Sequence, residues 1–133
     1  MAKQIFLNLP VADLPRSMAF FRALGFSFNA EWTDEHAACM VMGENLFTML
    51  LTRERFQSFT PKPVADAKTC SEVLICLAVD SRAEVDQKVA AALAAGGSVY
   101  KDAEDHGFMY AHGFQDLDGH IWELAYMAGQ DAA

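Results

Sequence analysis

Apolar residues along the chain follow two periodicities, one typical of strands and one typical of helices. Residues 5–11 are apolar and extended in character, which predicts a strand. Asp13 and Pro15 then supply an N-cap and a first-turn proline, and apolar residues at helical spacing follow up to Gly25. Glycine commonly ends helices. The pattern therefore predicts a strand followed by a helix over residues 14–24.

Three further strands complete this first unit. We expect them over residues 26–32, 36–42 and 46–51, where apolar and aromatic residues recur between polar breaks. The turn Gly43-Glu44-Asn45 separates the last two. A strand, a helix and three strands thus form a first module over residues 4–51.

The same order of elements begins again over residues 71–127. Ser81 and Glu84 form a capping box, in which each side chain satisfies a backbone N–H at the start of a helix. We expect strands over 72–79, 98–101, 108–114 and 120–126, with a helix over 82–95. An internal repeat of this size is a signal of fold. The sequence therefore predicts one α+β domain over residues 1–133, built from two βαβββ modules.

A long segment over residues 52–70 joins the two modules. It contains two prolines and two phenylalanines, Phe56 and Phe59. Loops of this length in compact domains are usually functional or mobile. The segment either covers one end of a binding site or is a plain connector packed by its two phenylalanines, and the sequence leaves both interpretations open.

Composition narrows the classes of function. The chain has 133 residues, of which 53% are hydrophobic, so one domain can bury a core of its own. A net charge of −8 argues against a nucleic-acid surface and against binding to anionic membranes. No apolar run has the length of a membrane span, and no apolar targeting region precedes the first strand, so we expect a cytoplasmic location. Cys39, Cys70 and Cys76 form no CxxC pair and are expected to be reduced thiols.

Two stretches of the sequence resemble the glyoxalase / bleomycin-resistance / extradiol-dioxygenase (vicinal oxygen chelate) superfamily. One runs over residues 9–17 and 20–26, and the other is Asp116-Leu117-Asp118-Gly119-His120-Ile121-Trp122-Glu123-Leu124. They lie in the matching modules, and together with the repeat the likeness covers nearly the whole chain. The resemblance implies a curved eight-stranded sheet, made by paired βαβββ modules, that encloses a cavity.

The resemblance also implies one divalent metal ion as a cofactor in that cavity. The glutamate of the Trp-Glu-Leu segment, here Glu123, is commonly a ligand. The family pattern expects His or Gln in the first strand, whereas the aligned residue is Phe6. The familiar ligand set is mostly absent, and a rearranged site of Glu123 and His112, with Glu72 and Asn8, is the arrangement that remains.

The register of the last hairpin decides which side chains accompany Glu123. A four-residue loop over 116–119 places His112 opposite Glu123, and directly paired residues share one face of a sheet. Alternation then brings further residues of the same strand to that face. A carboxylate at the centre of an apolar strand is costly to bury unless it is paired, protonated or metal-bound. We therefore expect Glu123 as the catalytic residue, Glu123 and His112 as metal ligands, and a set of substrate-binding residues: Asn8, Phe108, Tyr110, His112 and Phe114.

Two functions remain open, and both require a small, partly apolar molecule in the cavity. In the first, Glu123 acts as a general base or metal ligand in lyase, isomerase or dioxygenase chemistry, moving a proton next to a carbonyl or helping to chelate vicinal oxygens. In the second, the protein binds without catalysis, like the drug-sequestering relatives, because one fold hosts many chemistries. Open sheets leave edges that relatives protect by dimerising, so we expect a homodimer.

Overall fold

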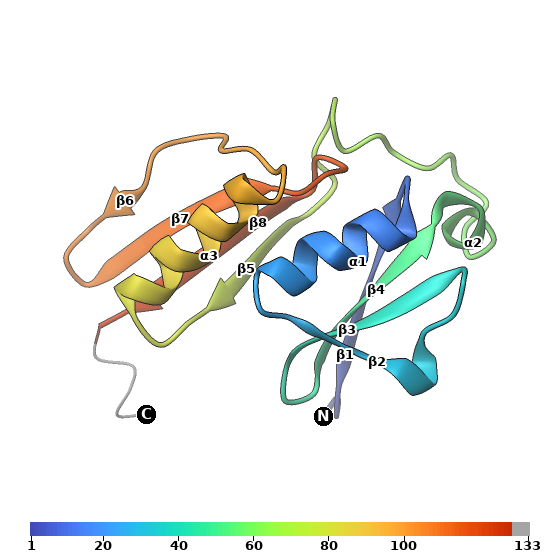
Figure 1. The fold of residues 1–133 in the computed structure, drawn as a ribbon, viewed down its shortest axis with the longest axis horizontal. Helices are drawn as coiled ribbons and strands as arrows, with labels where there is room; N and C mark the ends of the chain where they lie inside the picture. The colour runs from blue at the N-terminus through green and yellow to red at the C-terminus, as the bar shows by residue number, and fades with distance from the viewer. Residues whose placement is uncertain (129–133) are drawn as a thin grey trace. The chain divides into compact units, whose positions relative to one another are not determined.

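The chain divides into two compact units, Met1–Ala65 and Asp66–Ala133, in a computed structural model that describes residues 1–128. Each unit contains one four-stranded mixed sheet and one main helix (Figure 1). Strand, helix and three strands follow one another in both units, so the expected α+β class and the paired βαβββ modules are confirmed. The eight strands are organised as two sheets of four.

The first unit has the strand order β1-β4-β3-β2, with β1 parallel to β4 and the other pairs antiparallel. Its main helix begins where expected, because the Asp13 carboxylate accepts a hydrogen bond from the backbone N–H of Arg16 at 3.1 Å. Phe20 and Phe21 on this helix are buried. The elements are β1 Ile5–Val11, α1 Leu14–Ala23, β2 Ser27–Asn29, the 3-10 turn η1 Ala30–Trp32, β3 Ala37–Gly43, β4 Leu46–Thr52 and α2 Arg53–Gln57.

The second unit repeats this arrangement with the strand order β5-β8-β7-β6. Its helix starts with the expected capping box: the Ser81 hydroxyl accepts from the N–H of Glu84 at 3.1 Å, and the Glu84 carboxylate accepts from the N–H of Asp80 at 3.3 Å. Val85 and Val89 on this helix are buried. The elements are β5 Leu74–Ala78, α3 Arg82–Ala94, β6 Glu104–Asp105, β7 Met109–Gln115 and β8 Ile121–Met127.

Two local expectations were wrong, and the segment after β4 contains one element that was not expected. The strand expected over 98–101 is reduced to one bridge between Ser98 and Gln115, and pairing along that edge resumes only at β6. The strand expected over 26–32 ends at Asn29, whose side chain caps η1 instead. The segment after β4 contains the short helix α2, which starts because the Thr52 hydroxyl accepts from the N–H of Arg55 at 3.2 Å.

The register expected for the last hairpin was also wrong, by one residue. The backbone N–H of Asp116 donates to the carbonyl of His120 at 3.0 Å, so the loop has three residues and not four. Gly119 closes this loop with a φ of 90°, a left-handed conformation that glycine adopts without strain. As a result Gly113 lies opposite Glu123, and His112 lies opposite Leu124.

Within residues 1–128, no helix combines the length and the apolar character needed to cross a membrane.

Candidate functional site

The corrected register separates two faces of the second sheet. On the face that we call the helix face, Phe114, Trp122 and Leu124 are buried. Tyr110 belongs to this face as well, because its hydroxyl donates to the carboxylate of Asp86 on α3 at 2.6 Å. Alternation along each strand sends the residues between these positions to the opposite side of the sheet.

His112 and Phe114 therefore share the helix face with Tyr110 and not the face of Glu123. The ring of His112 is engaged with the backbone carbonyl of Lys101, at 3.2 Å from Nε2. Phe108 lies before β7 with 68% of its surface exposed. The expected pairing of Glu123 with His112 is thus wrong, because one residue of register moves a whole strand face to the other side.

The opposite side of the sheet, which we call the Glu123 face, carries a different row of residues. Cys76 on β5 lies directly beside Glu123 on β8, and Gly113 on β7 lies on its other side. Tyr100 crosses over this glycine: a Cβ on Gly113 would lie 2.6 Å from the Tyr100 hydroxyl oxygen. The row thus brings a thiol, a carboxylate and a phenol together across two strands and the segment before β6.

The charge of Glu123 acts on both neighbours. Burial raises the pKa of the Cys76 thiol, and the negative charge of Glu123 and a hydrogen bond to its carboxylate raise it further. Burial also raises the pKa of Tyr100, with Glu123 as the next cause. Thiol and phenol therefore stay protonated at neutral pH, and both are hydrogen-bond donors beside a carboxylate.

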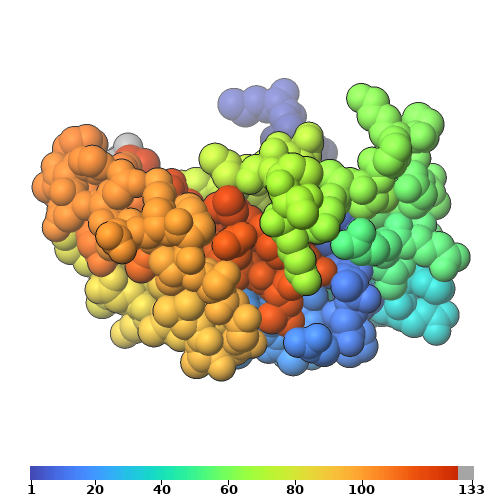
Figure 2. Space-filling model, turned by 90° about the horizontal axis from the view of Figure 1, so that it is seen from above, coloured from blue at the N-terminus to red at the C-terminus, as the bar shows by residue number. Residues whose placement is uncertain are grey.

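A polar rim lies along the edge of this face. Glu104, which pairs with Ala111 on β7, forms an ion pair with Lys101 and a hydrogen bond with the ring of His106, at 3.3 Å from Nε2. The hydrogen bond from Lys101 and then the one from His106 lower the pKa of the Glu104 carboxyl. The segment that contains these residues is part of the orange surface in Figure 2.

The remainder of the Glu123 face is mainly apolar. Leu74 on β5 is 68% exposed, and Ile121 on β8, which pairs with it, is half-buried. Ala78 on β5 and Ala125 on β8, which also pair with each other, lie on the same face. An apolar surface with one half-buried carboxylate and two neighbouring donors has the composition of a small-molecule binding site.

The residues around Glu123 do not fit the expected divalent metal ion. Beside Glu123 on the two neighbouring strands lie Cys76 and Gly113, and His112 lies on the other face, so the expected second ligand is not there. Glu72 precedes β5 and is exposed. Across residues 1–128, no group of three or more His, Cys, Asp or Glu side chains is arranged to hold a metal ion.

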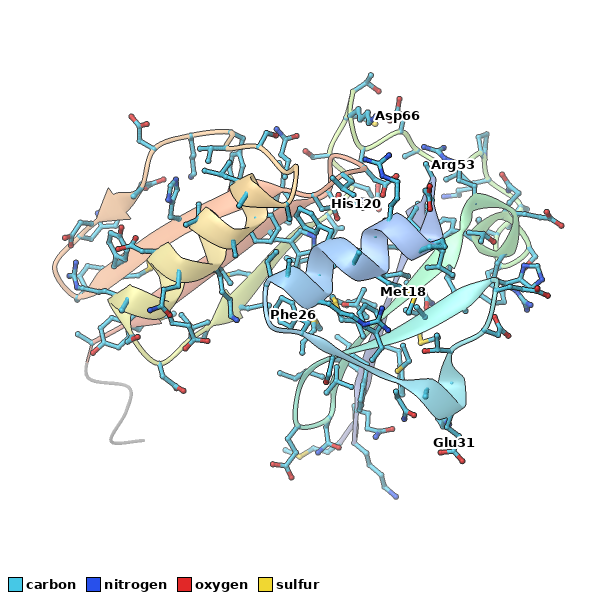
Figure 3. All side chains as sticks on the ribbon, in the orientation of Figure 1. Met18, Phe26, Glu31, Arg53, Asp66 and His120 are labelled. Atoms are coloured by element: carbon cyan, nitrogen blue, oxygen red, sulfur yellow. The ribbon has the colours of Figure 1, made fainter. Side chains whose placement is uncertain are left out.

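The first unit has its own exposed surface on the side that Asn8 occupies. Phe6 and Phe47 share this side with Asn8 and stack with ring centroids 4.9 Å apart. Trp32 stacks on Phe6 at 5.9 Å and is still 54% exposed. The side chain of Glu31, next to it on η1, points away from the sheet (Figure 3). This aromatic stack has no counterpart among the residues expected from sequence.

Tyr100 and Cys76 were also missed as neighbours of Glu123. A three-residue hairpin loop would have placed Gly113, and not His112, beside Glu123. It would not have revealed Cys76 or Tyr100, which reach Glu123 through pairings with other segments of the second unit. His120, labelled in Figure 3, is buried in the turn that sets this register.

Comparisons with known proteins find similarity over the whole chain. A family model described as bleomycin resistance protein-like N-terminal matches residues 3–43. The hypothetical protein SA1046 from S. aureus is 30% identical, with a TM-score of 0.80 over 95% of this chain and 94% of that one. A glyoxalase-related enzyme from Fulvimarina pelagi is 20% identical, with a TM-score of 0.78 over 94% of this chain and 88% of that one.

The fosfomycin resistance protein FosX from Listeria monocytogenes is 16% identical, with a TM-score of 0.68 over 100% of this chain and 99% of that one. Likeness at such low identity concerns the fold alone. No curated protein matches the sequence.

Proposed function

The chain belongs to the glyoxalase / bleomycin-resistance / dioxygenase superfamily, and on that premise we propose that it binds a small, partly apolar molecule on its Glu123 face. One observation carries the proposal: a half-buried carboxylate lies in an otherwise apolar strand, between the Cys76 thiol and the Tyr100 phenol. In this role Glu123 accepts hydrogen bonds from the ligand, and the apolar residues around it contact the ligand's hydrocarbon part.

A series of three probes of the same shape tests this role. Benzamidinium, benzamide and benzoate differ mainly in charge, and we expect benzamidinium to bind most tightly because its amidinium donates two hydrogen bonds to a carboxylate. Glu123→Gln should lower the affinity for benzamidinium roughly tenfold to a hundredfold, since a hydrogen bond to a charged group contributes about 1.5–3 kcal/mol. The affinity for benzamide should fall much less in the same variant, because its neutral amide forms weaker hydrogen bonds with a carboxylate. Amide NMR titration measures the affinities and maps the site.

Glu44→Gln is the matched control, because Glu44 is an exposed glutamate in a turn of the first unit. It should leave all three affinities unchanged. Chemical-shift changes that avoid Cys76, Tyr100 and Glu123, or equal weakening by both variants, would contradict the proposed site.

A second candidate function is proton transfer next to a carbonyl. It is favoured by the Tyr100 hydroxyl, a protonated donor close enough for the charge of Glu123 to raise its pKa. In such a reaction Glu123 would remove the proton next to the carbonyl, and the Tyr100 hydroxyl would donate a hydrogen bond to the oxygen of the enolate that forms. Incorporation of solvent deuterium into butane-2,3-dione distinguishes the two candidates: catalysis requires faster exchange with the protein, lost in Glu123→Gln and in Tyr100→Phe.

We also propose that the protein forms a homodimer. Each sheet ends in edge strands, and apolar side chains are exposed at the start of the edge strand β5: Leu74 has 68% of its surface accessible, and Val73, just before the strand, has 41%. Exposed edges and apolar surface favour association. Sedimentation equilibrium at micromolar concentration should give twice the chain mass of 14.6 kDa. The mass of a single chain there would contradict the dimer.

A further inference from the structure

The segment over residues 98–108 runs along β7 with little backbone pairing. Ser98 exchanges two backbone hydrogen bonds with Gln115, at 3.1 and 2.7 Å. Pairing then resumes only at the two-residue strand β6, followed by the N–H of His106 donating to the carbonyl of Met109 at 2.8 Å. Because few backbone bonds hold this segment, side chains must determine where Lys101 and Glu104 lie.

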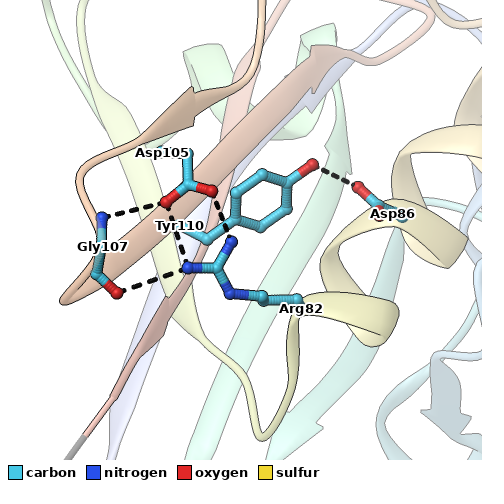
Figure 4. A network of polar contacts seen from close by, with 5 residues as sticks. All are labelled: Arg82, Asp86, Asp105, Gly107 and Tyr110. Atoms are coloured by element: carbon cyan, nitrogen blue, oxygen red, sulfur yellow. Dashed lines mark hydrogen bonds and ion pairs between the residues drawn. The ribbon is translucent and has the colours of Figure 1, made fainter.

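One arginine of α3 supplies most of that anchoring (Figure 4). The guanidinium of Arg82 donates to both oxygens of Asp105, at 2.7 and 3.1 Å, and to the carbonyl of Gly107 at 3.3 Å. Asp105 in turn accepts from the N–H of Gly107 at 2.9 Å. Planar, two-point pairing of this kind fixes orientation as well as distance. We call Arg82, Asp105 and Gly107 the Arg82 clamp.

The side chain of Tyr110 holds the clamp against α3. The carbon at the centre of the Arg82 guanidinium lies 5.1 Å from the centroid of the Tyr110 ring, a cation–π distance. The Tyr110 hydroxyl donates to Asp86, one turn further along α3, at 2.6 Å. Arg82 thus contacts the ring of Tyr110, and this ring is in turn anchored to α3, the helix that carries Arg82.

The clamp acts across the sheet because consecutive residues of a strand point to opposite sides. Asp105 faces Arg82 on the helix face, whereas Glu104 faces the other side, where it forms an ion pair with Lys101 and a hydrogen bond with His106. Fixing Asp105 therefore fixes Glu104. The hydrogen bond and the charge of Glu104 are the main causes that raise the pKa of Lys101, and Glu123 adds to them, so the ammonium lies in the field of both carboxylates.

We propose that Arg82 is a positioning residue for the Glu123 site: by holding Glu104 beside Lys101, it keeps the lysine from pairing with Glu123. The Glu123 carboxylate then stays available for a ligand that is cationic or donates hydrogen bonds, and the site selects against anions. This inference rests on the proposed function. Without the clamp, Lys101 pairs with Glu123 and competes with the ligand for the same oxygens.

Ligand-free thiol chemistry tests the inference first. In a Cys70→Ser background the remaining accessible thiol is Cys76, since Cys39 is buried. Arg82→Gln moves Lys101 toward Glu123, which cancels part of the charge that raises the pKa of Cys76. Alkylation by iodoacetamide near neutral pH should then be roughly threefold faster, because the rate follows the thiolate fraction. Adding Lys101→Gln to Arg82→Gln should return the rate to the starting value.

Probe binding gives the second readout. Arg82→Gln should lower the affinity for benzamidinium about tenfold, because Lys101 would then compete with the amidinium for the Glu123 carboxylate. Arg82→Gln with Lys101→Gln should bind it as the unchanged protein does, a rescue that a merely loosened fold would not give. Arg53→Gln, which removes an exposed arginine of the first unit, is the matched control and should change neither readout.

The outcomes separate the two proposals. A thiol rate unaffected by Arg82→Gln, or an increase that persists after Lys101→Gln is added, overturns the positioning role of Arg82. Absence of benzamidinium binding to the unchanged protein overturns the proposed function instead, and the thiol rates still decide the role of Arg82.

Discussion

Asp116→Ala is expected to destabilise the protein by about 3–5 kcal/mol, the range for removing one partner from a buried charged network. Asp116 is buried, with 6% of the residue exposed, and its carboxylate accepts hydrogen bonds from the turn and from β8. Its donors are the N–H groups of Asp118 at 2.9 Å and His120 at 3.0 Å, and the indole N–H of Trp122 at 3.0 Å. Alanine would leave these donors without their acceptor inside the fold, beside the turn that sets the register of β8.

Urea unfolding followed by circular dichroism measures this loss. Asp102→Ala is the control in the same unit, because Asp102 is exposed, and it should change the free energy of unfolding by less than about 0.5 kcal/mol. Equal effects of the two substitutions would contradict the structural role of Asp116. Asp116→Asn, which keeps one acceptor oxygen, should lie between them.

The pH dependence of the Asp116 contribution has a definite sign. Burial raises the pKa of this carboxyl from its usual 3.8, against the opposing effects of His120 and the N–H donors. A group with a raised pKa in the folded state contributes its stability below the unfolded pKa and loses it as the pH rises through the folded value. The advantage of the native residue over Asp116→Asn should therefore be larger at acid pH than at neutral pH, and the opposite trend would refute this.

Gly113→Ala is expected to cost about 3 kcal/mol, at the upper end of the usual range for overpacking. The added Cβ would clash with the carbonyl oxygen of Trp122, which is backbone and cannot move without disturbing β8. It would also lie 2.6 Å from the Tyr100 hydroxyl oxygen. The substitution should therefore displace Tyr100 from the Glu123 face as well as destabilise the sheet. Urea unfolding and the NMR signals of Tyr100 report the two effects separately.

Gly43→Ala is the matched control, a strand glycine of the first unit. The atoms nearest to its Cβ would be those of the Leu46 side chain, with Cδ1 at 3.2 Å, and a side chain of this kind can shift. We expect a loss below about 1 kcal/mol there. Tyr100→Ala combined with Gly113→Ala should recover only part of the loss, because the clash with the Trp122 carbonyl remains. Full recovery would show that the backbone contact has no cost.

Local sequence signals determined most of the fold. Asp13 with Pro15, and Ser81 with Glu84, mark the two helix starts, because a cap is an interaction between residues three or four apart. The apolar stripe after each cap then predicts a helix that packs on a sheet. The order of elements and the α+β class follow from these signals. The apolar residues that flank Glu123 in the sequence likewise predict that it lies within a strand.

The partners of Glu123 were decided only by the tertiary structure. Whether the last hairpin closes with four residues or three depends on the buried Asp116 network and on Gly119, whose φ of 90° completes the shorter loop. Side chains alternate with a period of two, so this one residue sends His112 and Tyr110 to the helix face. Cys76 and Tyr100 reach Glu123 through pairings between distant parts of the second unit, and no local pattern in the sequence records such pairings.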